Sequence, residues 1–203
     1  MQPKDKFIAF IDILGFSQLI AKLEENGEGF SEALELTEAL GPNICSVSLA
    51  GFGPTTCPSS TRIEENLDFQ ATQISDCVVI SVEISPAGII NLLSHCYGIS
   101  LKLLAKGALC RGSIIRGKIY HTNAQFFGTG YMSAYKGESQ VRFLQSSDAE
   151  KGTPFIALSD QITDYIKNDT DESVRMMAQR MTRSDGTYTA IYPFTQMGRN
   201  QVH

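Results

Sequence analysis

The sequence lacks the features that would define several classes of protein directly. Its five cysteines form no Cys-x-x-Cys pair and its three histidines form no cluster, so we expect reduced thiols rather than a zinc site. No G-x-x-x-x-G-K-[ST] pattern is present, which excludes Walker-type ATPase chemistry. No apolar stretch suits a membrane span, and the polar first six residues do not resemble a signal peptide. We therefore expect a cytoplasmic protein without a membrane partner.

Positive charge is also scarce. Seventeen basic and 22 acidic residues give a formal net charge of −5, so we expect no nucleic-acid partner that depends on many phosphate contacts. The composition, 42% hydrophobic and 19% charged, is that of a folded chain. At 203 residues one domain buries roughly 70% of the surface of its unfolded chain. We expect a single domain over residues 1–203.

Apolar periodicity and turn residues predict an alternation of strands and helices. The expected elements are a strand at 7–14, helices at 17–26 and 30–40, a hairpin at 69–82, a helix at 86–106, strands at 108–115 and 118–120, a helix at 131–136, a strand at 155–158, a helix at 159–166 and a closing hairpin at 181–192. This order predicts an α+β domain of ferredoxin-like type, with an antiparallel-rich sheet and helices on one face. Residues 43–66, rich in Gly, Pro, Ser and Thr, are expected to form an irregular excursion.

Asp12 interrupts an otherwise apolar strand that is expected to be buried on both faces. An ionised carboxylate in that position costs several kcal/mol, about 3 or more, unless it is paired, hydrogen-bonded or bound to a cation. Asp76 presents the same question at the tip of an apolar hairpin, where ordinary turn chemistry is the alternative. In a ferredoxin-like sheet the first strand lies beside this hairpin, so the two carboxylates are expected to meet. We therefore interpret them as ligands of a shared divalent cation, Mg²⁺ or Mn²⁺.

The residues that follow Asp12 add a second expected feature. The chain turns at Gly15 and enters a helix for which Ser17 is the expected cap. Exposed backbone N–H groups at a helix start bind anions. We expect phosphates to bind there while Asp12 holds the metal.

Three segments together resemble the class III nucleotidyl cyclase fold. They are Ile11-Asp12-Ile13-Leu14-Gly15-Phe16-Ser17, the Ile74-Ser75-Asp76 turn, and Gly128-Thr129-Gly130-Tyr131-Met132-Ser133-Ala134. Within that fold the chain looks most like the compact pyrimidine cyclases of Pycsar antiphage defence, by Ser75-Asp76, Arg111-Gly112-Ser113-Ile114 and Ala134-Tyr135-Lys136-Gly137-Glu138. The resemblance implies a homodimer with two metal ions at each interface site.

The resemblance also implies roles for individual residues. The metal ligands fall on Asp12, the backbone carbonyl of Ile13, and Asp76, and the phosphate-binding turn falls on Gly15 and Phe16. The positions that select a purine in adenylyl cyclases fall on Thr72 and Gln125, which do not rebuild a purine code. A smaller base is therefore expected, packed on Phe10 or Phe7.

Two positions depart from the family's pattern. The Asn and Arg that steady the ribose and the transition state fall on Met132 and Lys136, of which Met132 cannot donate a hydrogen bond. Arg111 is the candidate for the missing charge-stabilising role, with a structural ion pair as the alternative.

The resulting hypothesis is a metal-dependent cyclase that converts UTP to cyclic UMP and pyrophosphate, the product activating a separate defence effector. Three alternatives stay open. They are a cytidylate cyclase that makes cyclic CMP, a degenerate cyclase fold that senses a nucleotide without turnover, and a polymerase-palm-like enzyme that joins nucleotides.

Overall fold

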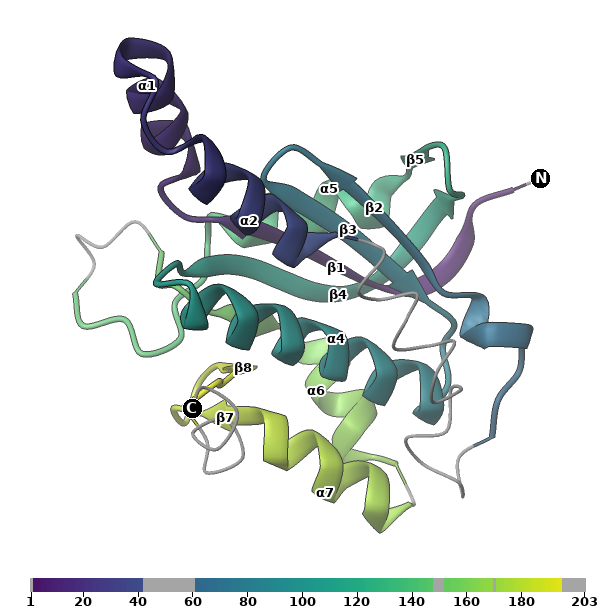
Figure 1. Cartoon of the computed structure of the whole chain (residues 1–203). Helices are drawn as coiled ribbons and strands as arrows, with labels where there is room; N and C mark the ends of the chain where they lie inside the picture. The colour runs from purple at the N-terminus through teal and green to yellow at the C-terminus, as the bar shows by residue number, and fades with distance from the viewer. Residues whose placement is uncertain (1, 42–60, 148–151, 170, 195–203) are drawn as a thin grey trace.

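The computed structural model describes residues 2–41, 61–147, 152–169 and 171–194. Its centre is a twisted sheet with the strand order β2-β3-β1-β4-β6-β8-β7, and β5 pairs with the far end of β4 (Figure 1). The strands are β1 (Lys4–Ile13), β2 (Gln70–Ile74), β3 (Cys77–Val82), β4 (Cys110–His121), β5 (Phe126–Phe127), β6 (Ile156–Leu158), β7 (Thr182–Ser184) and β8 (Thr189–Ile191). All pairs are antiparallel except β4 with β6, which confirms the predicted antiparallel-rich sheet.

Helices flank this sheet. They are α1 (Phe16–Asn26), α2 (Phe30–Leu40), α4 (Pro86–Ala105), α5 (Thr129–Glu138), α6 (Asp160–Lys167) and α7 (Glu172–Met181), with a short 3-10 helix η1 (Glu65–Asp68). The first strand lies between β3 and β4, so the hairpin formed by β2 and β3 is directly beside it, as the ferredoxin-like reading predicts.

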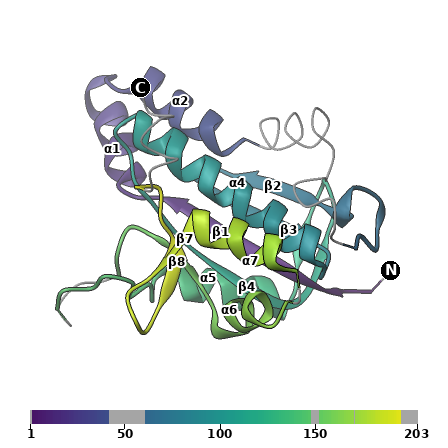
Figure 2. The same cartoon turned by 90° about the horizontal axis from the view of Figure 1, so that it is seen from below.

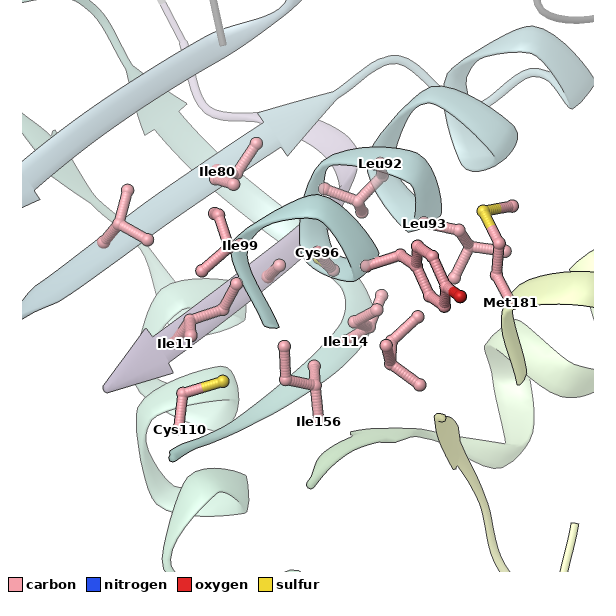
Figure 3. Close-up of a cluster of buried hydrophobic side chains, with 14 of the residues drawn as sticks. Ile11, Ile80, Leu92, Leu93, Cys96, Ile99, Cys110, Ile114, Ile156 and Met181 are labelled. Atoms are coloured by element: carbon pink, nitrogen blue, oxygen red, sulfur yellow. The ribbon is translucent and has the colours of Figure 1, made fainter. Parts of the chain in front are cut away.

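Alternation along β1 divides its side chains between two cores. Phe7, Ala9 and Ile11 face the larger core, which α4 fills with residues such as Leu92 and Cys96 (Figure 3). Helices α2, α6 and α7 pack on this same side, so this is the face of the sheet that helices were predicted to cover.

The opposite face of β1 carries Ile8, Phe10 and Asp12. Helix α5 lies on this face, where its Ala134 packs against Ile8 and Phe10 in a second, smaller core. The helical layer is therefore not confined to one face, and Figures 1 and 2 show α4 and α5 on opposite sides of β1 and β4. Asp12 lies on this second face two residues beyond Phe10, next to the end of β1.

Two local predictions were wrong. Gly117 does not end a strand, because β4 runs without a break through it to His121. This glycine is required by packing: a Cβ there would lie 2.8 Å from the Cα of Gly130, so its absence lets α5 approach the strand. The helix α7 was not predicted at all, because five of its ten residues are polar or charged and only Val174, Ala178 and Met181 of the ten are buried.

Helix α4 is the one helix in the described ranges that is long and apolar enough to cross a bilayer by length and composition. Of its most apolar window, 78% is buried inside the fold, so its hydrophobicity is accounted for by the core. Cys77, Cys96 and Cys110 take part in no disulfide within the described ranges, in line with the predicted reduced state of these three. Cys45, Cys57 and most of the predicted excursion at 43–66 lie outside the described residues.

Candidate functional site

Asp12 and Asp76 are brought together where β1 ends beside the turn of the β2–β3 hairpin. Asp12 pairs with Cys77 in the β1–β3 register, so Asp76 lies one residue further along. The backbone N–H of Ile13 donates to the carbonyl oxygen of Asp76 at 3.0 Å. The turn is closed by Ser75, which adopts a left-handed φ of 53°. Both aspartates are half-buried, and the predicted proximity of these two residues is confirmed.

The two carboxylates interact electrostatically. The pKa of Asp12 is raised to about 6, first by burial and then by the charges of Asp76 and Glu138, while Arg111 acts to lower it. Near neutral pH the ionised Asp12 is therefore held in an unfavourable environment. A bound cation would relieve that cost, because it would neutralise both carboxylates at once.

Asp12 and Asp76 provide only two carboxylates for the expected metal. Within the described ranges no group of three or more His, Cys, Asp and Glu side chains is arranged to hold an ion, so no closed protein cage exists there. Mg²⁺ is bound in proteins by one or two carboxylates, with water and substrate phosphate as further ligands. Asp12 and Asp76, with the Ile13 carbonyl beside them, fit that pattern, and the ligand assignment stays a prediction.

The start of α1 follows directly from this pair. Its N-cap is Gly15, in a left-handed conformation with φ of 81°, and not Ser17, which lies inside the helix; the predicted cap was wrong. No side chain caps the helix and its first turn holds no acidic residue. Phe16 is only 7% exposed and fixes the turn in the core. The helix end therefore presents backbone N–H groups and a positive dipole beside the carboxylates.

Arg111 is engaged in an ion pair. It lies opposite Asp12 in the β1–β4 register, but its Nε donates to Oε1 of Glu138 at 2.5 Å. The side chains of Arg111 and Glu138 are 19% and 10% exposed. Glu138, at the end of α5, was not identified from the sequence, because nothing local indicates that α5 returns to β4 at this point. Arg111 therefore lies near the site in a structural ion pair, which is the alternative expected for it from the sequence.

The predicted base-selecting positions also meet. The hydroxyl of Thr72 lies 3.5 Å from the carbonyl of Thr122, whose own N–H donates to the carbonyl of Gln125 at 2.9 Å. The side chain of Gln125 is exposed, whereas Thr72 is partly buried. The tip of the β4–β5 hairpin therefore lies against β2, which brings these two positions into one region.

His121 fixes that hairpin and was missed by the sequence analysis. Its Nδ1 lies 2.8 Å from the hydroxyl of Ser81, and its Nε2 lies 3.1 Å from the hydroxyl of Thr72. Burial lowers the pKa of His121 to about 4, so the ring is neutral at physiological pH. A neutral imidazole is both donor and acceptor, which suits a ring between two hydroxyl groups.

The two phenylalanines proposed to pack on a base are not available for it. Phe7 was wrongly assigned, because it faces the opposite side of the sheet from Asp12, is fully buried and lies edge-on to Tyr165. Phe10 faces the same side as Asp12 but is only 4% exposed, under Tyr131 and Tyr135. The accessible ring on this face is Tyr135, which is 57% exposed.

Met132 and Lys136 lie on the exposed side of α5, one helical turn apart. Met132 is 54% exposed, and Phe127 in β5 is exposed to the same extent. Tyr135, three residues after Met132 in the same helix, is also exposed. Lys136 occupies the position where the resemblance expects an arginine, and it is exposed.

No protein-family model matches the sequence, and no curated protein matches it. Among solved structures the chain is similar to a bacterial light-regulated adenylyl cyclase, at 15% identity and a TM-score of 0.48, over 100% of this chain and 56% of that one. It is also similar to a class III adenylyl cyclase-like ATP-binding protein from Pseudomonas aeruginosa, at 11% identity and a TM-score of 0.43, over 84% of this chain and 37% of that one. The chain thus spans about half or less of these proteins. Both are too distant for an activity to be inferred from them, and the α+β fold rests on the topology described above.

Proposed function

We propose that this chain is a metal-dependent nucleotide cyclase that converts UTP to cyclic UMP and pyrophosphate. The observation that carries the proposal is the placement of Asp12 and Asp76 side by side next to the uncapped start of α1. Paired carboxylates and a phosphate-binding helix end are the two elements that a nucleoside triphosphate with its divalent ions requires.

Asp12, Asp76 and the carbonyl of Ile13 would hold Mn²⁺ or Mg²⁺, with two ions at each site. The bound ions would activate the 3′-oxygen and neutralise the triphosphate. In the reaction a bond forms between the ribose 3′-oxygen and the α-phosphorus, the bond from that phosphorus to the β-phosphate oxygen breaks, and the hydroxyl proton passes to solvent. The backbone at Gly15 and Phe16 would orient the phosphates for this in-line displacement.

The proposed preference for a pyrimidine rests on the residues at the base-selecting positions. Thr72 and Gln125 lie at the base-selecting positions that the resemblance assigns, and neither provides the charged groups of a purine code. Tyr135 offers an exposed ring for stacking in place of the buried Phe10. UTP is the proposed substrate and CTP the alternative, with cyclic UMP as a cytoplasmic second messenger that activates a separate antiphage effector.

A homodimer is part of this proposal. Phe127, Met132 and Tyr135 are exposed large apolar side chains of β5 and α5, and burying them against a second copy would place each site at the interface. Metal ligands would then come from one subunit and base contacts from its partner. Lys136, on the same exposed side of α5, would supply charge to the triphosphate.

One observation favours a second candidate function. Arg111 is neutralised by Glu138, and Met132 stands where the family has a hydrogen-bond donor, so the groups that stabilise a transition state are weak. A nucleotide-binding protein without turnover would retain the aspartate pair and the helix start, and would lack these groups.

Product analysis tests these alternatives. The purified chain is incubated with Mn²⁺ and an equimolar mixture of ATP, GTP, CTP and UTP, and the products are identified by mass spectrometry. Cyclic UMP with released pyrophosphate is the expected result, and a dominant cyclic CMP would support the alternative substrate. Nucleotide binding without pyrophosphate release would identify a sensor, and linked dinucleotides would identify a polymerase-like enzyme; either result would contradict the proposal.

A further inference from the structure

Helices α1 and α2 form a helical pair, residues 16–40, which we call the α1–α2 arm. Figure 1 shows α1 extending beyond the end of the sheet, with α2 beside it. Of the eleven residues of α1 only Phe16 is buried, and α2 is the element against which α1 packs most. Helix α2 packs on α1 and α4, and its buried residues are Ala33, Leu36, Ala39 and Leu40. The rest of its surface faces solvent.

The solvent side of α2 carries two large apolar side chains. Phe30 is 64% exposed and Leu34 is 49% exposed. They are four residues apart, which places them on one face of the helix, and the exposed Glu38 follows on that face after another four residues. A Phe–Leu pair at this spacing stabilises a helix slightly, and single exposed apolar side chains are common, so this pair alone does not define a binding surface.

The negative charge of the chain is concentrated in the same arm. Residues 16–40 contain six of the 22 acidic residues and, in Lys22, one of the 17 basic ones, so the arm has a net charge of −5. The rest of the chain holds equal numbers of the two kinds and carries no net charge. Glu35 pairs with Lys106 of α4 at 2.7 Å, and within the described ranges no other glutamate of the arm forms an ion pair.

The positions of these glutamates do not favour the two helices. Glu24 and Glu25 lie in the last turn of α1 and Glu38 in the last turn of α2, and neither turn holds a basic residue. A carboxylate at the C-terminal end of a helix is repelled by the helix dipole. Glu32, Glu35 and Glu38 are also spaced three residues apart, where like charges repel. Helix stability therefore does not explain why the arm is acidic.

We propose that the exposed side of α2 binds a segment of another protein in which lysine or arginine side chains flank large apolar ones. Phe30 and Leu34 would bury against the apolar side chains, and the glutamates around them would attract the cations. Charge complementarity selects this occupant, because anionic lipid, nucleic acid and the arm of a second copy are all negative and would be repelled. The proposal does not depend on the proposed cyclase activity.

Fluorescence anisotropy with the full chain, without metal or nucleotide, tests this surface. The probes are three short labelled peptides of equal length. The first combines lysines with leucines at helical spacing, the second has serine in place of every leucine, and the third has glutamate in place of every lysine. At physiological ionic strength the first should bind at least about tenfold more tightly than the other two. Equal binding of the second or third peptide, or no binding of the first, would overturn the proposal.

A double variant locates the apolar contact. Phe30→Ser/Leu34→Ser should weaken binding of the lysine–leucine peptide at least about tenfold, because both side chains that bury on binding are removed. Met176→Ser is the matched control, since Met176 is 47% exposed on α7, and should keep full affinity. Unchanged affinity in the folded double variant would show that the peptide binds elsewhere. Sedimentation velocity adds a second outcome: a dimer that dissociates in the double variant would make a second copy the occupant and overturn the proposal.

A charge reversal separates a binding role from a structural one. Glu38→Lys should weaken binding of the lysine–leucine peptide about fivefold or more. It should also raise the urea midpoint, because a lysine in the last turn favours the helix dipole that the glutamate opposes. Glu172→Lys makes the same charge change at an exposed site of α7 and should leave the affinity unchanged. Equal weakening by the two variants would mean that net charge alone governs binding, and would contradict a site on the arm.

Discussion

Arg111 stands directly opposite Asp12 across β1 and β4, yet it donates its Nε–H to Glu138. The arginine is thus paired with the carboxylate of a helix end, and its positive charge does not outweigh the burial and the like charges that raise the pKa of Asp12 to about 6. The site therefore retains uncompensated negative charge, which is the condition under which a divalent cation binds.

Glu138→Gln should destabilise the fold. The pair is largely buried, and the variant removes the carboxylate to which the Arg111 guanidinium donates, a loss of about 3 kcal/mol in the free energy of unfolding. Urea denaturation measures it. Glu35→Gln is the control, because Glu35 forms an exposed ion pair with Lys106 and its loss should shift the urea midpoint much less. Equal losses for the two variants would show that the Arg111–Glu138 pair has no special role.

Asp12→Asn should stabilise the metal-free protein at neutral pH. The pKa of Asp12 is raised to about 6 in the folded chain, above its ordinary value of 3.8, so the folded state binds more protons between these values and stability falls as the pH rises through them. The free-energy cost of the ionised Asp12 carboxylate is fully present above about pH 6, and the neutral amide of the variant removes it. We expect a higher urea midpoint for the variant at pH 7.5 in EDTA and a smaller difference at pH 4.5. A variant less stable than the wild type at pH 7.5 would contradict the assignment.

His121 should make stability depend on pH in the opposite direction. Burial lowers its pKa from 6.5 to about 4, so the unfolded chain binds more protons than the folded one between these values. Its contribution is therefore present above pH 6.5 and is lost as the pH falls towards 4. His95 has the same shift from burial, so His121→Gln should reduce the slope of unfolding free energy between pH 6.5 and 4.5 without abolishing it. An unchanged slope would mean that His121 is protonated in the folded state.

Asp76→Asn should remove cyclase activity and leave the fold intact. Asp76 is half-exposed at a hairpin tip, and its backbone carbonyl, which accepts from Ile13, is retained in the variant. Loss of one of two carboxylate ligands should lower cyclic nucleotide formation by about 100-fold or more, since the metal supplies several kcal/mol of transition-state stabilisation. Asp164→Asn, an exposed change in α6, is the control and should keep full activity. Substantial turnover in Asp76→Asn would remove this residue from the site.

The fold could be predicted where the local pattern and the tertiary contacts agree. The apolar β1, the hairpin around Ser75 and the Ser85-Pro86 start of α4 carry strong local signals, and the structure confirms them. The proximity of Asp12 and Asp76 followed from strand order alone. The prediction for Phe7 was wrong because Phe7 and Asp12 are five positions apart. An odd separation in a strand places two side chains on opposite faces.

Other parts of the site depend on contacts that no local pattern records. Gly117 looks like a turn, and only the approach of α5 to β4 explains it. Glu138 and His121 acquire their roles from residues 27 and 40 positions away, Arg111 and Ser81. Such pairings are set by how α5 and the β4–β5 hairpin return to the sheet, so the sequence alone could not reveal them.

Manganese binding tests the central claim most directly. Electron paramagnetic resonance measures free Mn²⁺ in the presence of the wild type or of the Asp12→Asn/Asp76→Asn double variant, each with an α,β-methylene analogue of UTP that cannot release pyrophosphate. The account predicts that the wild type withdraws more Mn²⁺ from solution than the analogue does alone, and that the folded double variant withdraws no more than the analogue. Equal Mn²⁺ binding by the two proteins would contradict it.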